Sequence, residues 1–140
     1  MYFFSCYMSR VNINATSNGW YPMSGAPTLL PTIDVRSPQP GTAVVVLGGE
    51  HDLYSADRLQ QTFDDLLLGN EHLIADLSSA DFIDSTIIGV LIKTSKEAEG
   101  RARKFTIVLG TAPVVERILE VTGVLVLFNV VPTVELALAA

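Results

Sequence analysis

Residues 81–89, DFIDSTIIG, place three small polar residues between two apolar segments. Residues 72–77 before them favour a strand, and a helix is expected from Ser85 onward. The start of a helix leaves backbone N–H groups unpaired, and Asp84 or Ser85 could bind them as an N-terminal cap. A hydroxyl at this point is also exposed on a rigid element, where a phosphate would lie at the positive end of the helix dipole. The residues alone therefore leave open a capping role and a modification role.

Nucleophilic catalysis by Ser85 would need a base, and His51 with Asp52 is the candidate pair. The sequence has no GxSxG segment, and a carboxylate that is the chain neighbour of a histidine orients its ring poorly. Phosphate-binding loops of the GxxxxGK[ST] and GxGxxG types are also absent from the sequence. His51 and His72 lack the spacing of a metal-binding pair, and Cys6 is the only cysteine. We therefore predict no catalytic residue, no metal and no cofactor, and a chain that is not an enzyme.

The composition favours one globular domain that does not bind membranes or nucleic acids. The 140 residues are 49% hydrophobic and 17% charged, which allows a sizeable core. No apolar run approaches the roughly 18 residues that would span a bilayer. With 15 acidic and 9 basic side chains the net charge is −6, which argues against a nucleic-acid partner. A single cysteine fits a reducing compartment, so a cytoplasmic protein is expected.

The first 30 residues differ in kind from the rest of the chain. They contain no acidic residue and one basic residue, Arg10, and their apolar residues follow no steady period. They also lack the basic start of a signal peptide. We predict a flexible or atypical N-terminal arm over residues 1–30 and a folded domain over residues 31–140. Translation from Met23 is an alternative, which would leave residues 1–22 outside the native protein.

The rest of the chain alternates between strand-like and helix-like segments. Short apolar or β-branched runs bounded by Pro or Gly favour strands at residues 32–37, 42–49, 72–77, 104–110 and 124–131. Apolar spacing along one face favours helices at residues 55–69, 85–99, 112–123 and 133–140. The first two strands are expected to pair as an antiparallel hairpin. The order β-β-α-β-α-β-α-β-α predicts an α/β fold with a mixed, mostly parallel sheet of four to five strands and about four helices.

The order and spacing of several motifs resemble the STAS domain, and more narrowly the bacterial anti-sigma factor antagonists. The matching pieces are Gly49-Glu50-x-Asp52, Asp76-Leu77, Phe82-Ile83-Asp84-Ser85, Gly89-Val90-Leu91 and Pro113-x-Val115-x-Arg117-Ile118-Leu119, ending at Thr122-Gly123. The resemblance covers residues 31–140. It implies a single STAS-type domain with the same order of elements as the one predicted above.

This resemblance implies a binding protein that is controlled by phosphorylation. The unphosphorylated form would bind an anti-sigma factor serine kinase and so free a sigma factor for transcription. Phosphorylation of Ser85 would reverse this binding, and a serine phosphatase would restore it, with Thr86 as an alternative target. Asp84 would position the Ser85 hydroxyl in a protein that is a monomer or weak dimer. The partner surface implied in this way comprises Glu50, Asp52, Asp84, Ser85, Thr86, Ile87 and Ile88.

One departure from the family lies in the first turn after Ser85. The family commonly has Gly-Leu-Gly after the serine pair, whereas this chain has Ile87-Ile88-Gly89. A glycine in the first helical turn lets a partner backbone approach closely. We therefore expect Ile87 to fill that space and to alter kinase access or kinase specificity.

Other functions use the same fold. A scaffold subunit of the stressosome type would predict a stable oligomer and weak phosphorylation. A small-ligand sensor would require a pocket lined by Gly48, Gly49 and Ser85. A STAS domain attached to a transporter is disfavoured because the sequence contains no membrane segment.

Overall fold

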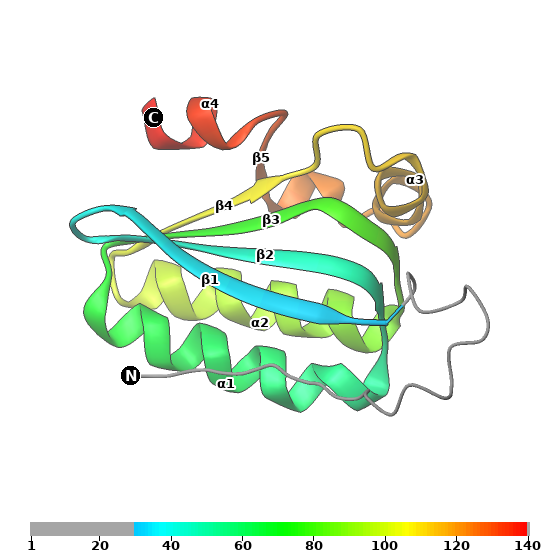
Figure 1. Cartoon of the computed structure of the whole chain (residues 1–140), viewed down its shortest axis with the longest axis horizontal. Coiled ribbons are helices and arrows are strands. Elements are labelled where there is room, and N and C mark those ends of the chain that lie inside the picture. The colour runs from blue at the N-terminus through cyan, green and yellow to red at the C-terminus, as the bar shows by residue number, and fades with distance from the viewer. Residues whose placement is uncertain (1–29, 140) are drawn as a thin grey trace, which may run out of the picture.

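The β-branched run that follows Gly41 forms the second strand of a five-stranded sheet (Figure 1). This sheet is seen in a computed structural model of the chain, which describes residues 30–139. Strand β1 runs antiparallel to β2, and β3, β4 and β5 continue the sheet in parallel and in chain order. The predicted mixed, mostly parallel sheet is thus confirmed. The strands are β1 (Thr32–Gln39), β2 (Thr42–His51), β3 (His72–Ile83), β4 (Lys104–Val108) and β5 (Asn129–Val131).

The helices follow the predicted order, which confirms the succession β-β-α-β-α-β-α-β-α. Two boundaries differ clearly from the prediction. The strand expected at residues 72–77 continues to Ile83. The strand expected at residues 124–131 begins only at Asn129, because the preceding residues form the 3-10 turn η3 (Leu125–Leu127). A continuous apolar run has no period that separates a strand from a helical turn. The helices are α1 (Leu53–Gly69), α2 (Ser85–Gly100), α3 (Pro113–Val121) and α4 (Val134–Ala139).

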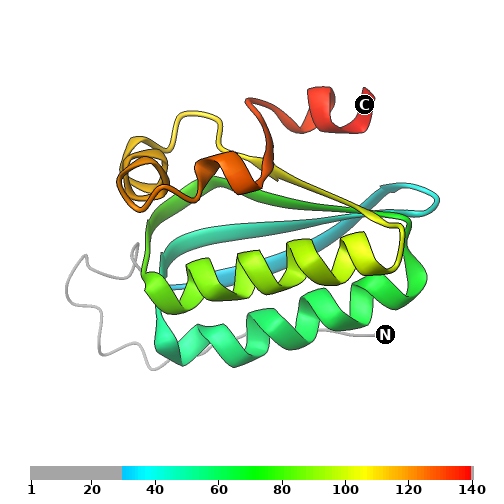
Figure 2. The ribbon, with the colours of Figure 1, turned by 180° about the vertical axis from the view of Figure 1, so that it is seen from behind.

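Successive residues of the strands enter separate cores on the two faces of the sheet, as the two-residue repeat of a strand requires. Val45 and Leu73 lie in the larger core, on the face that α1 and α2 cover. Figure 2 shows these two helices side by side against the sheet. Val44 and Ile74 point to the other face, where Ala137 of α4 packs against them. Helices on both sides of the central strands explain why these strands are almost continuously apolar.

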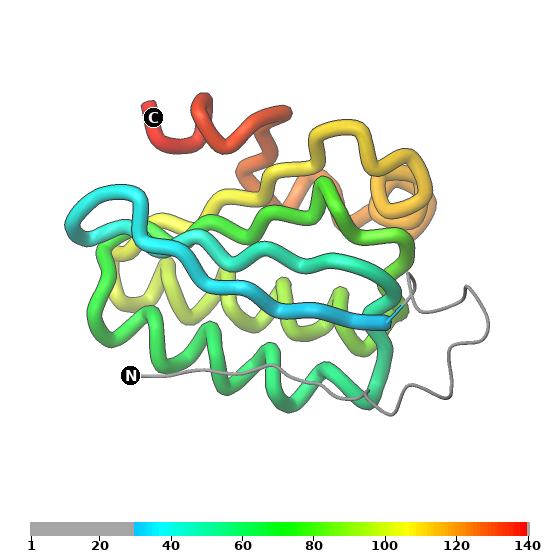
Figure 3. The backbone as a smooth tube through the Cα atoms, in the orientation of Figure 1, coloured from blue at the N-terminus to red at the C-terminus, as the bar shows by residue number. Residues whose placement is uncertain are grey.

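Two strand-to-helix junctions lie at the same end of the sheet. In the tube view the backbone passes from β2 to α1, and from β3 to α2, at this shared end (Figure 3). Because β1 is antiparallel to β2, its first residue, Thr32, also lies there, paired with Gly48. Ligand and partner sites of open α/β sheets gather beyond the carboxyl ends of the parallel strands, so this end positions the candidate site.

The predicted arm at residues 1–30 falls almost wholly outside the described residues and stays a prediction. Within residues 30–139 no helix combines the length and apolar character that crossing a bilayer would require.

Candidate functional site

The carboxyl ends of β2 and β3 bring the two predicted site segments together. In the parallel pairing of these strands, Glu50 lies opposite Phe82 and His51 lies opposite Ile83. The next residue of each chain segment begins the turn into a helix. The surface that results is called here the Ser85 surface, and it comprises the exposed or half-buried residues Glu50, Asp52, Leu53, Tyr54, Phe82, Asp84, Ser85, Thr86 and Gly89.

Asp84 is the N-terminal cap of α2. Its Oδ1 atom accepts hydrogen bonds from the backbone N–H groups of Thr86 at 3.0 Å and Ile87 at 3.1 Å. Its own N–H donates to the carbonyl oxygen of His51 at 3.2 Å. The extended backbone of Asp84 is the conformation that a capping residue adopts. The capping role in this segment therefore belongs to Asp84, which leaves the neighbouring hydroxyl without that task.

Ser85 is the first residue of α2, and its side chain is exposed. Thr86, the next residue, is half-buried and so less exposed than Ser85. One turn further along the same face, Gly89 is exposed, and an added Cβ atom there would meet no atom within 4 Å. The surface beside Ser85 is therefore open, because the glycine one turn further along has no side chain that could obstruct access.

Ile87 and Ile88 lie in the core, which corrects their predicted place in the partner surface. Their side chains are 0% and 7% exposed and belong to the cluster beneath the sheet. A side chain three residues after the cap points back toward the sheet, and Ile87 begins an inward-facing stripe that continues through Leu91 and Ala98. Ile87 therefore does not fill the space over the first turn of α2. In the described residues it does not obstruct access to Ser85, contrary to what was expected.

The neighbouring junction presents apolar side chains that the sequence analysis missed. Asp52 caps α1 by accepting a hydrogen bond from the N–H of Tyr54 at 2.9 Å. The two residues after this cap are strongly exposed, Leu53 at 64% and Tyr54 at 91%. Phe82, across the strand pair, is 41% exposed. Leu53 and Tyr54 lie off the apolar stripe of α1, and that departure from the helical period was the available signal.

The His51 ring does not form a catalytic pair with Ser85. Its Nε2 atom lies 3.1 Å from the carbonyl oxygen of Thr32 and 3.0 Å from that of Gly48. Its Nδ1 atom lies 3.0 Å from the hydroxyl of Ser55, and the side chain is fully buried. Burial lowers the pKa of His51, so the neutral ring is favoured. Both ring nitrogens are thus occupied by groups other than Ser85.

The Ser85 surface is acidic as well as apolar. Glu50 is exposed, and Asp52 and Asp84 are half-buried, each at the end of a strand. Among residues 30–139 no group of three or more His, Cys, Asp or Glu side chains is placed to hold a metal ion. Such a mixture of carboxylates and exposed apolar side chains is suited to contact with a protein that carries basic and apolar groups.

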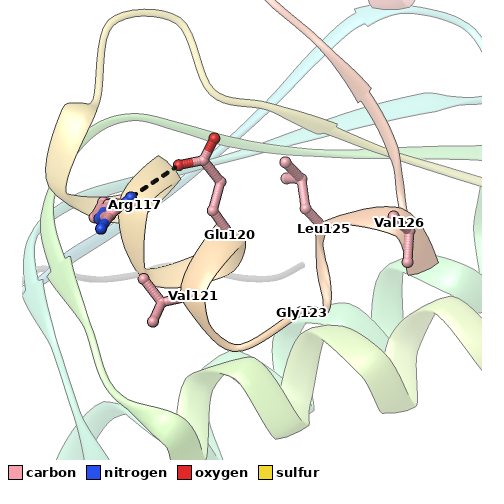
Figure 4. A pocket seen from close by; sticks show the side chains of 6 residues that line it. All are labelled: Arg117, Glu120, Val121, Gly123, Leu125 and Val126. Atoms are coloured by element: carbon pink, nitrogen blue, oxygen red, sulfur yellow. Dashed lines mark ion pairs between the residues drawn. The ribbon is translucent and has the colours of Figure 1, made fainter.

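A separate groove of about 470 Å³ lies between α3 and η3 (Figure 4). Arg117 and Glu120 both line this groove and form an ion pair of 3.8 Å. A small-ligand sensor was expected to have a pocket lined by Gly48, Gly49 and Ser85. None of these three residues lines the groove. At Gly48 an added Cβ atom would lie 2.5 Å from the Thr32 hydroxyl oxygen, so that space is already occupied. The lining residues are Arg117, Glu120, Val121, Gly123, Leu125 and Val126.

Solved structures with this fold include regulators and a transporter-family protein. An anti-sigma factor antagonist from Mycobacterium paratuberculosis is 28% identical, with a TM-score of 0.70 over 79% of this chain and 92% of that one. The Bacillus cell fate determinant SpoIIAA, in its phosphorylated form, shares the fold at 18% identity and a TM-score of 0.60, over 77% and 97%. A sulfate transporter family protein from Wolinella succinogenes also shares the fold. It is 19% identical, with a TM-score of 0.61 over 74% of this chain and 87% of that one. The STAS domain family matches residues 35–137, and the chain belongs to this family.

Proposed function

We propose that this chain is an anti-sigma factor antagonist that binds an anti-sigma factor serine kinase and thereby frees a sigma factor. The observation that carries the proposal is the exposed Ser85 at the start of α2, directly after the cap Asp84 and at the end of the sheet that also carries exposed apolar side chains. The likeness to an anti-sigma factor antagonist at 28% identity supports the same function. In this proposal the chain is a binding module and not an enzyme.

The unphosphorylated Ser85 surface is the binding-competent form. Exposed aromatic side chains supply much of the binding energy in protein interfaces, because they bury a large area with little loss of rotamer freedom. Tyr54 and Phe82 are such side chains, and Leu53 lies next to Tyr54. Glu50 and Asp52 add negative charge around them, which favours a partner whose facing groups are basic.

Phosphorylation of Ser85 is the step that ends binding. The Ser85 hydroxyl oxygen attacks the γ-phosphorus of ATP, the bond from that phosphorus to the ADP oxygen breaks, and the hydroxyl proton passes to a base of the kinase. The product carries about −1.5 to −2 additional charge at neutral pH. The helix dipole of α2 stabilises this charge, so the fold persists. The phosphate adds repulsion to the carboxylates of the same surface, and burying these charges under a packed partner carries a desolvation cost, so the partner dissociates until a serine phosphatase removes the phosphate.

The test compares kinase binding by the wild type with binding by Ser85→Ala and Ser85→Asp. Wild type and Ser85→Ala are expected to bind alike, whereas Ser85→Asp loses about tenfold in affinity, which is ~1.4 kcal/mol. Ser37→Asp is the matched control, because it adds the same charge at an exposed serine near the far end of the β1–β2 hairpin. With ATP, the kinase should phosphorylate the wild type and not Ser85→Ala.

Equal losses in Ser85→Asp and Ser37→Asp would contradict a specific role for Ser85. Phosphate that still appears in Ser85→Ala would assign the reaction to another hydroxyl, with Thr86 first, which Thr86→Val would check. The function also places the protein in the cytoplasm, where it acts as a monomer or weak dimer. Sedimentation over a range of protein concentrations tests that state, and a stable large oligomer would favour the scaffold function instead.

A further inference from the structure

One buried residue, His51, links three elements beneath the Ser85 surface. Its ring contacts the carbonyl oxygens of Thr32 in β1 and Gly48 in β2, and the Ser55 hydroxyl in α1. Its main-chain carbonyl oxygen accepts the N–H of Asp84, the cap of α2, at 3.2 Å. The junction that carries the exposed apolar side chains and the junction that carries Ser85 therefore meet at a single residue.

The partners of the ring fix where its protons lie. Carbonyl oxygens only accept hydrogen bonds, so Nε2 carries a proton and donates it toward Thr32 and Gly48. In the neutral ring Nδ1 accepts, and the Ser55 hydroxyl must donate to it. In the charged ring Nδ1 donates to the Ser55 oxygen, and the Ser55 hydroxyl proton turns to the carbonyl oxygen of Asp52, which lies 3.2 Å away. Both forms are satisfied, and they differ in the bond that Asp52 receives.

We propose that His51 is a positioning residue for the Ser85 surface, and that protonation of its ring changes the conformation of both helix starts together. The inference rests on the proposed function for its biological meaning, because the surface it controls is the one assigned to the kinase. In the neutral state the Ser55 hydroxyl donates to the ring and not to the carbonyl oxygen of Asp52. In the charged state the ring donates to the Ser55 oxygen, the Ser55 hydroxyl donates to the carbonyl oxygen of Asp52, and a positive charge lies beneath an acidic surface.

The burial of the ring, its hydrogen bonds and the nearby charged groups together determine the pH range of this change. Burial is the largest influence on the pKa of His51 and lowers it, the hydrogen bonds to Thr32 and Gly48 raise it, Arg58 lowers it and Asp52 raises it. Neutral His51 is therefore the form at pH 7 and above, and the change takes place below the ordinary histidine value of about 6.5. Mild acid, rather than neutral conditions, is where the surface should respond.

The test is a pH titration of the isotope-labelled protein by NMR, with no partner present. The expected result is one midpoint below 6.5 that is shared by the His51 ring and by the amides of Tyr54 and Asp84. In Ser55→Ala the ring should still titrate while the Tyr54 amide loses its response. In His51→Leu, which keeps an apolar side chain in the buried position, the amides of Tyr54 and Asp84 should no longer share a midpoint in this range.

The second histidine provides the internal control. His72 also has a pKa that burial lowers, but its Nε2 atom contacts the Thr106 hydroxyl at 2.9 Å, at the amino end of β3. The variant His72→Gln should therefore leave the midpoints of Tyr54 and Asp84 unchanged. The proposal is overturned if the His51 ring stays neutral until the protein unfolds in acid, if either amide ignores its titration, or if the responses persist in His51→Leu.

The two proposals can fail separately. The titration needs no kinase, so coupled midpoints can be observed even if no kinase binds the protein. Conversely, Ser85→Asp can abolish kinase binding while the amides ignore His51, which would overturn the positioning role alone.

Discussion

The two strand-to-helix junctions of the Ser85 surface have the same sequence of structural elements, but polar and apolar residues occupy opposite positions in them. Each strand ends in a fully buried residue, His51 or Ile83, and each helix begins after a capping aspartate. The first helical residue is the exposed apolar Leu53 in one junction and the exposed polar Ser85 in the other. The residue two positions further is buried in both. It is the polar Ser55 in α1 and the apolar Ile87 in α2.

This contrast separates two tasks that an interface with a covalent switch must perform. The α1 junction presents side chains with large apolar area, which give affinity through burial. The α2 junction presents a small hydroxyl over a tightly packed core, which gives a site for added charge without disturbing the fold. Substitutions of exposed residues at the α1 junction should therefore weaken binding more than stability. Substitutions of buried residues at the α2 junction should lower stability more.

The largest expected effect is loss of stability in Ile87→Ala. Removing a fully buried isoleucine should cost about 2–5 kcal/mol of the free energy of unfolding, because a cavity remains in the core. Leu53→Ala is the matched change at the other junction, and with 64% of Leu53 exposed it should cost less than about 0.5 kcal/mol. Urea unfolding measures both variants. Similar losses in the two would show that the junctions do not differ as described.

The next effect concerns affinity, and here the order is reversed. Tyr54→Ala should weaken kinase binding by about 2 kcal/mol, roughly thirtyfold in Kd, with little change in stability. Isothermal titration calorimetry measures the affinity. Val126→Ala is the control, because Val126 is 88% exposed but lies in the α3–η3 groove, and it should bind normally. If Val126→Ala loses as much affinity as Tyr54→Ala, the partner does not distinguish the Ser85 surface from the groove.

A smaller difference separates the two caps. Asp84 accepts hydrogen bonds from two backbone N–H groups, and Asp52 accepts one from Tyr54. Asp84→Ala should therefore cost about 1–2 kcal/mol of unfolding free energy, and Asp52→Ala about 0.5–1 kcal/mol. Thermal and urea unfolding of both variants test the order. A greater loss for Asp52→Ala would show that the α1 start depends on its cap more than the hydrogen bonds indicate.

The smallest effect is a pH dependence of stability that arises from the histidines. Burial lowers the pKa values of His51 and His72, so below about pH 6.5 the unfolded chain binds more protons than the native protein. Their stabilising contribution is full above that pH and is lost as the pH falls through the lowered native values. The slope cannot exceed about 1.4 kcal/mol per pH unit for each histidine.

Urea unfolding at pH 8.0, 6.5 and 5.5 measures this slope. His51→Leu places an apolar side chain at the end of β2, as Ile83 does at the end of β3. This variant lacks one titrating group, so its unfolding free energy should depend less steeply on pH. His72→Gln should reduce the slope in the same way, since it removes the other histidine. A wild-type stability that rises as the pH falls from 6.5 to 5.5 would contradict the assigned sign.

The sequence predicted the elements with strong periods and missed the phase of one helix. The strands β1 to β4 were found as short apolar or β-branched runs bounded by Pro or Gly, and the four helices were found from their helical repeat. In α2 the partner surface was expected to include Ile87 and Ile88, whereas the structure buries both of them, together with Thr94. Thr94 is fully buried, and its hydroxyl has no hydrogen-bond partner within the described residues. A search for apolar spacing cannot choose such a polar residue.

For the candidate site, the sequence located the junction but not the packing beneath it. The capping carboxylate and the exposed Ser85 follow from residue types at a strand-to-helix boundary. The exposed Phe82 and the contacts of His51 depend on the register of β2 against β3 and of β1 against β2. Register is decided by the whole sheet, so a single strand segment does not reveal it.

The order of the strands in the sheet is the order in which the ribosome makes them. Each new strand pairs with the strand completed just before it, so every strand pairing spans only the turn or helix that connects two consecutive strands. Every residue of the Ser85 surface precedes residue 90, and β4 and β5 add to the opposite side of β3. The hairpin and the first two crossover helices can therefore assemble in the direction of synthesis, and the sheet grows without any strand waiting for a partner from the far end.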